Sequence, residues 1–334
     1  MEKLISIVVP AYNIKDYIHN CLEHFNQVSE EYLDLFEVLV VNDGSHDETP
    51  QIVEDYMTQA KYDLRLINKE NGGHGSTINQ GMHEAVGYYF KVVDGDDWII
   101  PQEFQKLLDA LKDKQADMVI TDYTEQHVYN NTSILKSYSN KFEEGKLYTG
   151  IPKEWIRMHT LTYKRSILVD HNIRLSEKTF YVDVQYTLFP LEYVASYKYI
   201  KADVYQYFIG REDQSMNLNV MKQKRDHHDR VVRSVIDFYA LTQKPDIIEV
   251  LDTLLTRLIN DQVLINLMSD NGDQLNRELF AYMEQKGFKF KLNLGNKTSG
   301  LAYINYQTKG VLSWLIKPLI NKKIASYQDA KSLR

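Results

Sequence analysis

Short apolar runs alternate with amphipathic segments over the first third of the chain. The apolar runs predict buried strands at residues 4–9, 36–41, 64–67, 88–93 and 118–121. Between them, the spacing of apolar positions predicts helices at residues 49–61 and 102–114. It also predicts a helix that Asn13 can cap and that runs to about Gln27, and a helix that follows the glycine-rich turn at 71–75 and runs toward Val86. Because strands that alternate with helices indicate βαβ units, we predict an α/β fold with a Rossmann-like, mostly parallel central sheet flanked by helices.

The pattern becomes mixed after residue 122 and mostly helical after residue 220. A helix is predicted at 183–193, a strand at 204–209 and a long amphipathic helix at 247–268. We therefore expect one domain over residues 1–220, composed of two halves (1–122 and 123–220), and a helical region at 221–334.

Polar residues follow three of the predicted strands at the points where the strands end. They are, in chain order, Pro10-Ala11-Tyr12-Asn13, Asp43-Gly44-Ser45 and Asp94-Gly95-Asp96-Asp97. In open α/β sheets, ligands bind beyond the carboxyl ends of the strands. We therefore expect these three segments to lie side by side and to form one site.

The acidic segment carries three carboxylates, those of Asp94, Asp96 and Asp97. Like charges this close repel and have to be neutralised. A divalent cation neutralises them, and hard oxygen ligands suit Mg²⁺ or Mn²⁺. An acidic turn hinged at Gly95 is the alternative, and the segment alone does not decide between the two interpretations.

Composition excludes several other classes of protein. The net charge of −7 argues against a nucleic-acid binder that relies on a broad basic face. The single cysteine, Cys21, excludes an internal disulfide framework and fits a reducing compartment. No apolar run approaches the ~20 residues that a membrane span needs, and the N-terminus lacks the apolar region of a signal peptide. We expect a cytoplasmic protein.

The glycine patterns exclude two common kinds of phosphate site. No GxxxxGK[ST] occurs, so a P-loop is unsupported. No GxGxxG follows the first strand, and the glycine-rich turn at 71–75 comes after the third strand instead, so a dinucleotide fingerprint is absent too.

Four motifs together resemble those of the family 2 glycosyltransferases, which have the A-type glycosyltransferase fold. They are SIVVPAYN (6–13), VVNDGSHDET (40–49), NGGHGSTINQG (71–81) and VVDGDDW (92–98). The resemblance covers roughly the first 215 residues. It implies inverting transfer of a sugar from a UDP-sugar or dTDP-sugar to a hydroxyl of a glycan or lipid-linked acceptor, in the synthesis of bacterial cell-surface polysaccharide. Residues 1–122 would then bind the nucleotide sugar, and 123–220 would form the acceptor side.

The resemblance also implies roles for individual residues. Asp43 would accept the imide N–H of the base, although a cap in an Asp-Gly turn is the alternative, and Asp96 would bind the Mn²⁺ or Mg²⁺ that bridges the diphosphate. Asp94 would contact either the ribose or the metal. Other donor contacts are implied for Pro10, Tyr12, Asn13, Asn71, Gly72, Gly73, Asn79, Gly95, Arg211 and Ser215. A surface salt bridge is the alternative for Arg211.

An inverting transfer needs a carboxylate that takes the proton of the acceptor hydroxyl. In the family this base opens a helix downstream of the Asp-x-Asp motif, often as Glu-Asp. Val182-Asp183 stands in that place here, so the resemblance makes Asp183 the catalytic base. A simple helix-terminal carboxylate is the alternative. Asp97 is expected to cap the next helix or to support the metal site. Trp155 and His159 are expected to share a helix face, where they could line an acceptor pocket, although packing in the core is the favoured interpretation.

Two other classes compete with this hypothesis. A sugar-1-phosphate nucleotidyltransferase would carry a glycine-rich loop after the first strand, where PAYN stands instead. A catalytically inactive carbohydrate-binding or scaffold protein is disfavoured by the intact Asp94, Asp96 and Asp183.

The segment at 311–320 is apolar, contains Trp314 and is flanked by lysines. A helix of this kind can lie on an anionic membrane surface, which would suit a lipid-linked acceptor. It could equally dock onto the domain or onto a second subunit. Peripheral membrane contact and a homo-oligomer therefore both stay open.

Overall fold

The computed structural model describes residues 3–210, 218–290, 297–311, 313–316 and 318–319. The chain forms two compact units, Met1–Arg211 and Glu212–Arg334, which we call the N-terminal and the C-terminal unit. The expected functional boundary at residue 220 stays a prediction.

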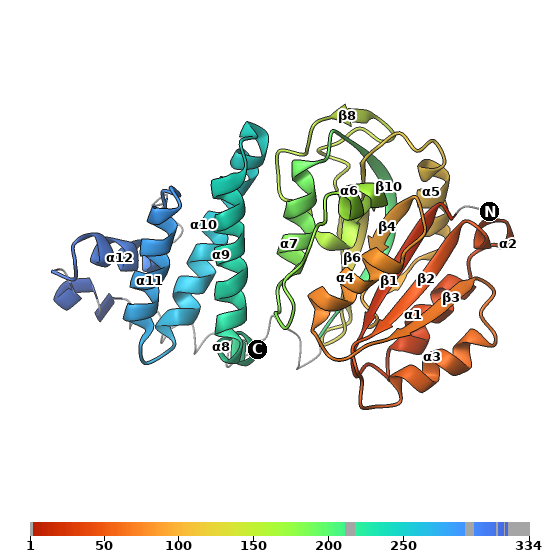
Figure 1. The fold of residues 1–334 in the computed structure, drawn as a ribbon, viewed down its shortest axis with the longest axis horizontal. Coiled ribbons are helices and arrows are strands. Elements are labelled where there is room, and N and C mark those ends of the chain that lie inside the picture. Colours follow the sequence, from red (N-terminus) through yellow and green to blue (C-terminus); the bar gives the residue numbers. More distant parts are fainter. Residues whose placement is uncertain (1–2, 211–217, 291–296, 312, 317, 320–334) are drawn as a thin grey trace. The chain divides into compact units, whose positions relative to one another are not determined.

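A single sheet organises the N-terminal unit (Figure 1). Its strands run in the order β3-β2-β1-β4-β9-β6-β10-β5, while β7 pairs with β6 and β8 pairs with β10. The strands are β1 (Ile5–Ala11), β2 (Phe36–Asn42), β3 (Asp63–Asn68), β4 (Tyr89–Val92), β5 (Trp98–Ile99), β6 (Met118–His127), β7 (Thr132–Lys136), β8 (Leu147–Thr149), β9 (Leu161–Lys164) and β10 (Ser196–Ile209).

The strands from the first part of the chain are parallel, and the later ones make the sheet mixed. β1 pairs in parallel with both β2 and β4, and β2 does so with β3. β9 runs antiparallel between β4 and β6, and β5 runs antiparallel to β10. Because β1, β2 and β4 are parallel neighbours, the chain leaves all three at the same edge of the sheet. The predicted α/β fold is confirmed.

Three helices cover one face of the sheet. They are α1 (Ile18–Asn26), α3 (Thr49–Met57) and α5 (Pro101–Leu111), with the short α2 (Glu30–Leu33) beside them. Phe36 of β2 is central to this core, since its ring centroid lies 5.3 Å from that of Phe104 and 6.1 Å from that of Phe25. All three rings are fully buried, which accounts for the continuous apolar run at this strand.

The opposite face carries α4 (His74–Glu84), α6 (Arg165–Asp170) and α7 (Asp183–Leu188), with the 3₁₀ helices η1 (Met158–Thr160) and η2 (Phe189–Glu192). A glycine on α4 sets how closely this layer approaches the sheet. A Cβ at Gly81 would lie 2.5 Å from both γ-carbons of Val8, so a larger residue would push α4 away from β1. The amino end of α4 is thereby held near the strand ends.

The C-terminal unit is helical within the described residues. Its helices are α8 (Leu218–Gln223), α9 (Arg225–Leu241), α10 (Pro245–Leu267), α11 (Gly272–Gln285) and α12 (Lys297–Gln307). The predicted helix at 311–320 lies partly outside the described residues, so its membrane contact stays a prediction. None of the described helices has the length and apolar character that crossing a membrane would require.

A buried carboxylate connects several strands near their amino ends. Glu37 of β2, 1% exposed, accepts hydrogen bonds from Ser6 Oγ, from Val86 N at 2.8 Å and from Arg65 Nη2 at 2.8 Å. Ser6 Oγ in turn accepts from Gly87 N at 2.8 Å. This network joins β1, β2 and β3 to the turn before β4.

Glu37→Ala should destabilise the protein by about 2–3 kcal/mol, because it leaves two buried donors and a guanidinium without their acceptor. Urea unfolding measures the change. Glu48→Ala is the matched control, since Glu48 makes an exposed ion pair with Lys15 at 2.7 Å and should leave the unfolding midpoint where it was. Equal midpoints for the two variants would contradict this assignment.

Candidate functional site

The carboxylate of Asp43 fastens the glycine-rich loop to the end of β2. Asp43 is 2% exposed. Its Oδ1 accepts from Gly72 N and from Lys69 Nζ, both at 2.9 Å, and its Oδ2 accepts from Gly73 N at 2.7 Å. Asn71 Nδ2 donates to the Asp43 carbonyl at 2.9 Å. The N–H groups of Gly72 and Gly73 thus bind Asp43, and the contacts of these two glycines with a nucleotide sugar stay a prediction.

The other side of this loop is covered by residues 175–178. A Cβ at Gly73, whose φ is +83°, would lie 3.1 Å from Lys178 N, and one at Gly75 would lie 2.2 Å from Ser176 O. Asn79 binds the same segment, with Nδ2 2.9 Å from Leu175 O and Oδ1 2.9 Å from Leu175 N. Both ends of the Asn79 amide are therefore occupied by backbone, and this residue positions the segment.

His74, the first residue of α4, joins the glycine loop to the acidic segment. Its Nε2 lies 2.8 Å from Asp94 Oδ1. Burial disfavours the imidazolium, but the charge of Asp94 and its hydrogen bond, with Asp183 and Asp96, outweigh this and raise the pKa of His74. Burial acts to raise the pKa of Asp94, yet His74 holds it below the usual value. His74 lies inside the glycine-rich motif, but nothing in the local sequence indicates its contact with Asp94.

Asp97 belongs to the interior of the site. It is 1% exposed and accepts hydrogen bonds from Tyr205 Oη and from Phe208 N, the latter at 2.7 Å. Burial, together with the charges of Asp96 and Asp94, raises the pKa of Asp97 well above its usual range. The helix-cap prediction for Asp97 is wrong, because Ile100 is the N-cap of α5. Instead, Asp97 holds β10 against the end of β4.

His159 completes a group that could hold a metal ion. One ligand atom each from Asp94, Asp97 and His159 lies within 4.8 Å of the others. Burial lowers the pKa of His159 to about 4, so its ring is neutral at pH 7, the form that binds metals. Its Nδ1 is buried and has no hydrogen-bond partner among the described residues. Asp96 is not part of this group, and its role as a ligand stays a prediction.

A buried lysine fixes the backbone around His159. Lys91 of β4 is fully buried, and its Nζ donates to His159 O at 2.7 Å and to Leu161 O at 3.3 Å. Burial lowers the pKa of Lys91 to about 7. The predicted helix shared by Trp155 and His159 is wrong, since Trp155 lies in an irregular segment and His159 in η1.

Asp183 opens α7, as the sequence predicted. Burial raises the pKa of Asp183, although the nearby charges of His74 and Arg157 act in the opposite direction. No described residue forms an ion pair with its carboxylate. The electrostatic effects show that Asp183, His74 and Asp94 lie near one another.

The segments after β1, β2 and β4 are hydrogen-bonded to one another, as expected because these strands end at the same edge of the sheet. Asn13 N donates to Ser45 Oγ at 3.0 Å, and Asn13 Oδ1 accepts from His46 N at 2.8 Å. Asn13 therefore does not cap α1, which begins at Ile18. Gly95 N donates to Pro10 O at 3.3 Å, and Tyr12 is 46% exposed beside them. Arg211 and Ser215 lie outside the described residues.

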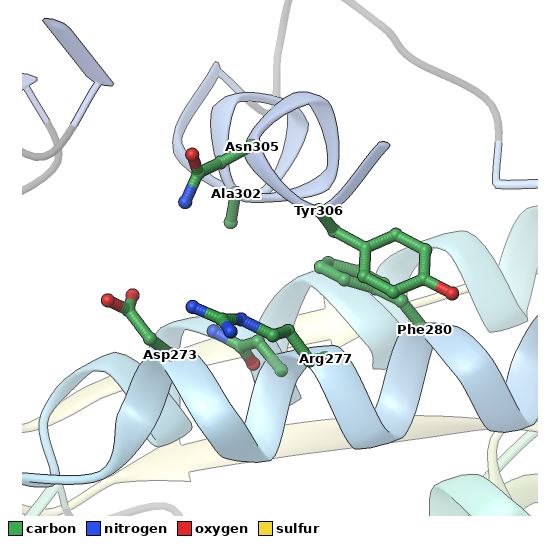
Figure 2. Close-up of a pocket in the computed structure, with 7 residues that line it drawn as sticks. Asp273, Arg277, Phe280, Ala302, Asn305 and Tyr306 are labelled. Carbon is green, nitrogen blue, oxygen red and sulfur yellow. The ribbon is translucent and has the colours of Figure 1, made fainter. Parts of the chain in front are cut away.

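A small hollow in the C-terminal unit is unsuited to a nucleotide sugar. It lies between α11 and α12 and is lined by Asp273, Asn276, Arg277, Phe280, Ala302, Asn305 and Tyr306 (Figure 2). Its volume of about 10 Å³ gives room for roughly one water molecule.

The fold is an α/β sheet with a cluster of carboxylates beyond the carboxyl ends of its strands, and comparison with known proteins identifies the family. The model of the family "Glycosyl transferase family 2" matches residues 6–171. The chain therefore belongs to the family 2 glycosyltransferases.

Two curated relatives and one solved structure illustrate the similarity. Putative glycosyltransferase EpsH of Bacillus subtilis is 31% identical over 219 residues, which cover 61% of this chain and 60% of EpsH. Chondroitin synthase of Pasteurella multocida is 30% identical over 229 residues, covering 67% of this chain and 22% of the synthase. The match thus spans less than two thirds of each relative. The structure of S. aureus TarS 1-349 with UDP-GlcNAc has a TM-score of 0.56 and 18% identity, covers 91% of this chain and 92% of TarS 1-349, and shows a shared fold.

Asp43→Asn should loosen the glycine loop, because an amide offers one acceptor oxygen where the carboxylate offers two. We expect amide hydrogen exchange at Gly72 and Gly73 to accelerate about 10- to 100-fold, the equivalent of one or two lost charge-assisted bonds. Asp47→Asn is the control, since Asp47 accepts from Thr49 N at 3.0 Å in the neighbouring loop. Unchanged exchange at both glycines in Asp43→Asn would refute the anchoring role.

Proposed function

We propose that this chain is an inverting, metal-dependent glycosyltransferase of the cytoplasm, which moves a sugar from a UDP-sugar, or alternatively a dTDP-sugar, to a hydroxyl of a glycan or lipid-linked acceptor in cell-surface polysaccharide synthesis. The observation that carries the proposal is that Asp43, Asp94 and Asp183 all act on the amino end of α4: Asp43 binds Gly73 N, Asp94 binds His74, and the charge of Asp183 acts on His74. The UDP-GlcNAc bound by TarS, which shares the fold, supports a UDP-sugar as donor.

The donor nucleotide would lie across the ends of β1 and β2. Asp43 Oδ2 has one described donor, Gly73 N, so it keeps acceptor capacity for the imide N–H of uracil or thymine. The exposed ring of Tyr12 and the polar Asn13 border the same place, next to Pro10. Gly72 and Gly73 contribute by letting the loop lie against Asp43. Arg211 and Ser215 remain candidates for contacts with the diphosphate and donor.

Residues at the end of β4 fit a divalent cation. The neutral ring of His159, with its buried and unpartnered Nδ1, and the ionised Asp94 are suited to bind such a cation. We propose Asp96, next to Gly95, as a further oxygen ligand. A bound Mn²⁺ or Mg²⁺ would supply positive charge for the leaving diphosphate. Asp97, with its raised pKa and its bonds to β10, would hold Asp94 and Tyr205 in place.

Asp183 would act as the general base for the acceptor hydroxyl. Its raised pKa makes the carboxylate a stronger proton acceptor than an ordinary aspartate. The absence of an ion-pair partner among the described residues leaves the carboxylate available to an acceptor. The proton taken up by Asp183 would come from the hydroxyl as its oxygen attacks the anomeric carbon.

Asp96→Ala should abolish the dependence of donor binding on metal. Removing even a group that supports a metal ligand costs about 10- to 100-fold in metal affinity, so loss of a ligand should cost at least as much. Calorimetric titration of UDP with and without Mn²⁺ measures this. Asp109→Ala on the exposed face of α5 is the control. Retention of the full Mn²⁺ effect in Asp96→Ala would remove Asp96 from the site.

Asp183→Asn should spare UDP binding and reduce turnover by about 10²- to 10⁴-fold, because the amide cannot take a proton. In the wild type, kcat/KM should fall with decreasing pH at a value above the ~3.9 of an ordinary aspartate, since the base must be ionised and its pKa is raised. Asp170→Asn, at the exposed end of α6, should change neither quantity. Full turnover in Asp183→Asn would show that another group is the base.

A further inference from the structure

An arginine next to the proposed base has no partner that accounts for its charge. Arg157 is half-buried, and none of its five N–H groups donates to an acceptor or pairs with a carboxylate among the described residues. A guanidinium in such a place loses hydration without gaining hydrogen bonds. Its planar fork of donors is suited to the two oxygens of a carboxylate or phosphate.

Aromatic stacking holds this guanidinium in one place. Arg157 Cζ lies 4.3 Å from the centre of the Trp155 ring. This cation–π contact holds the charge of Arg157 over the indole without using its N–H groups as donors to an oxygen acceptor. The turn that carries Arg157 is fixed as well, because its carbonyl accepts from Thr160 N at 3.2 Å and from Thr160 Oγ1 at 2.8 Å.

The Trp155 ring that contacts Arg157 is hydrogen-bonded to the helix that carries Asp183. Trp155 Nε1 donates to Thr187 Oγ1 at 2.7 Å. Thr187 and Asp183 are four residues apart on α7, so their side chains lie on the same helix face, with Cβ atoms roughly 5–6 Å apart. Arg157 also acts electrostatically on both Asp183 and His159. The guanidinium therefore lies beside the place where the acceptor hydroxyl would react.

From this arrangement we propose that Arg157, stacked on Trp155, binds an anionic group of the acceptor, either a carboxylate or a phosphodiester, next to the hydroxyl that receives the sugar. The proposal rests on the proposed function for the position of the acceptor. It adds that the acceptor is an acidic glycan or a polyol phosphate, and that Arg157 selects it over a neutral one. Because the chain has a net charge of −7, a general attraction to polyanions would not produce this preference.

Binding of two matched pairs of probes tests the proposal. The first pair is a uronic-acid oligosaccharide and its carboxyl-reduced form, and the second is a glycerol-phosphate oligomer and a neutral oligoglycerol. Calorimetry at fixed ionic strength with UDP and Mn²⁺ present should give about 10- to 100-fold tighter binding of the acid in at least one pair, as expected for charge-assisted bonds. The pair that shows the preference distinguishes a carboxylate from a phosphodiester.

Arg157→Gln should abolish this preference while leaving the affinity for UDP unchanged. Arg157→Lys should retain part of it, because the charge stays and the fork is lost. Arg165→Gln is the matched control. Arg165 Nε donates to Gly87 O at 3.1 Å, at the amino end of β4 and away from the carboxyl ends of the strands, where the site lies. This control should keep the full preference.

Three outcomes would overturn the proposal. They are the absence of a preference in both pairs, a preference that survives in Arg157→Gln, and a loss of UDP affinity in that variant. The second, accompanied by a shifted pH–rate profile, would make Arg157 a residue that only tunes Asp183, and the third would make it a donor contact. Failure of the proposed function is separate, since it would appear as no Mn²⁺-dependent UDP binding by the wild type.

Discussion

The carboxylates at the end of β4 can be buried only if other parts of the chain compensate their charge. His74 binds Asp94 from α4, and Tyr205 and Phe208 bind Asp97 from β10. Burying an uncompensated carboxylate is costly, so each of these contacts holds its segment in place. Segments far apart in the sequence therefore converge at this point, and the positions of the glycine loop and of β10 depend on it.

The same environment gives neighbouring acids different protonation states. Asp94 beside His74 has a lowered pKa, whereas Asp97 among buried groups has a raised one. Divergent pKa values of this kind are how one site assigns different chemical roles to like side chains. Asp94 suits a cation, Asp97 suits a structural hydrogen bond, and Asp183, with its raised pKa, suits proton transfer.

The local sequence pattern was enough to predict the parallel part of the sheet, because its strands are continuous apolar runs. It also predicted that the three polar segments share one edge, because parallel strands end on the same side of a sheet. It failed where a partner comes from far along the chain. Nothing near Lys91 indicates that it reaches η1, and the motif around His74 does not show Asp94 twenty residues away. The antiparallel β9 and the engagement of Asn79 with Leu175 are equally long-range. These contacts depend on tertiary packing, which periodicity does not record.

The proposed function depends on the ends of β1, β2 and β4 forming one donor site, with the base at the start of α7 beside it. A crystal structure with UDP and Mn²⁺, with data collected at the manganese absorption edge, tests it most directly. We expect an anomalous peak bound by Asp94 or Asp96 at the end of β4 and a uracil ring hydrogen-bonded to Asp43. A peak bound elsewhere in the chain, or a uracil away from the end of β2, would contradict it.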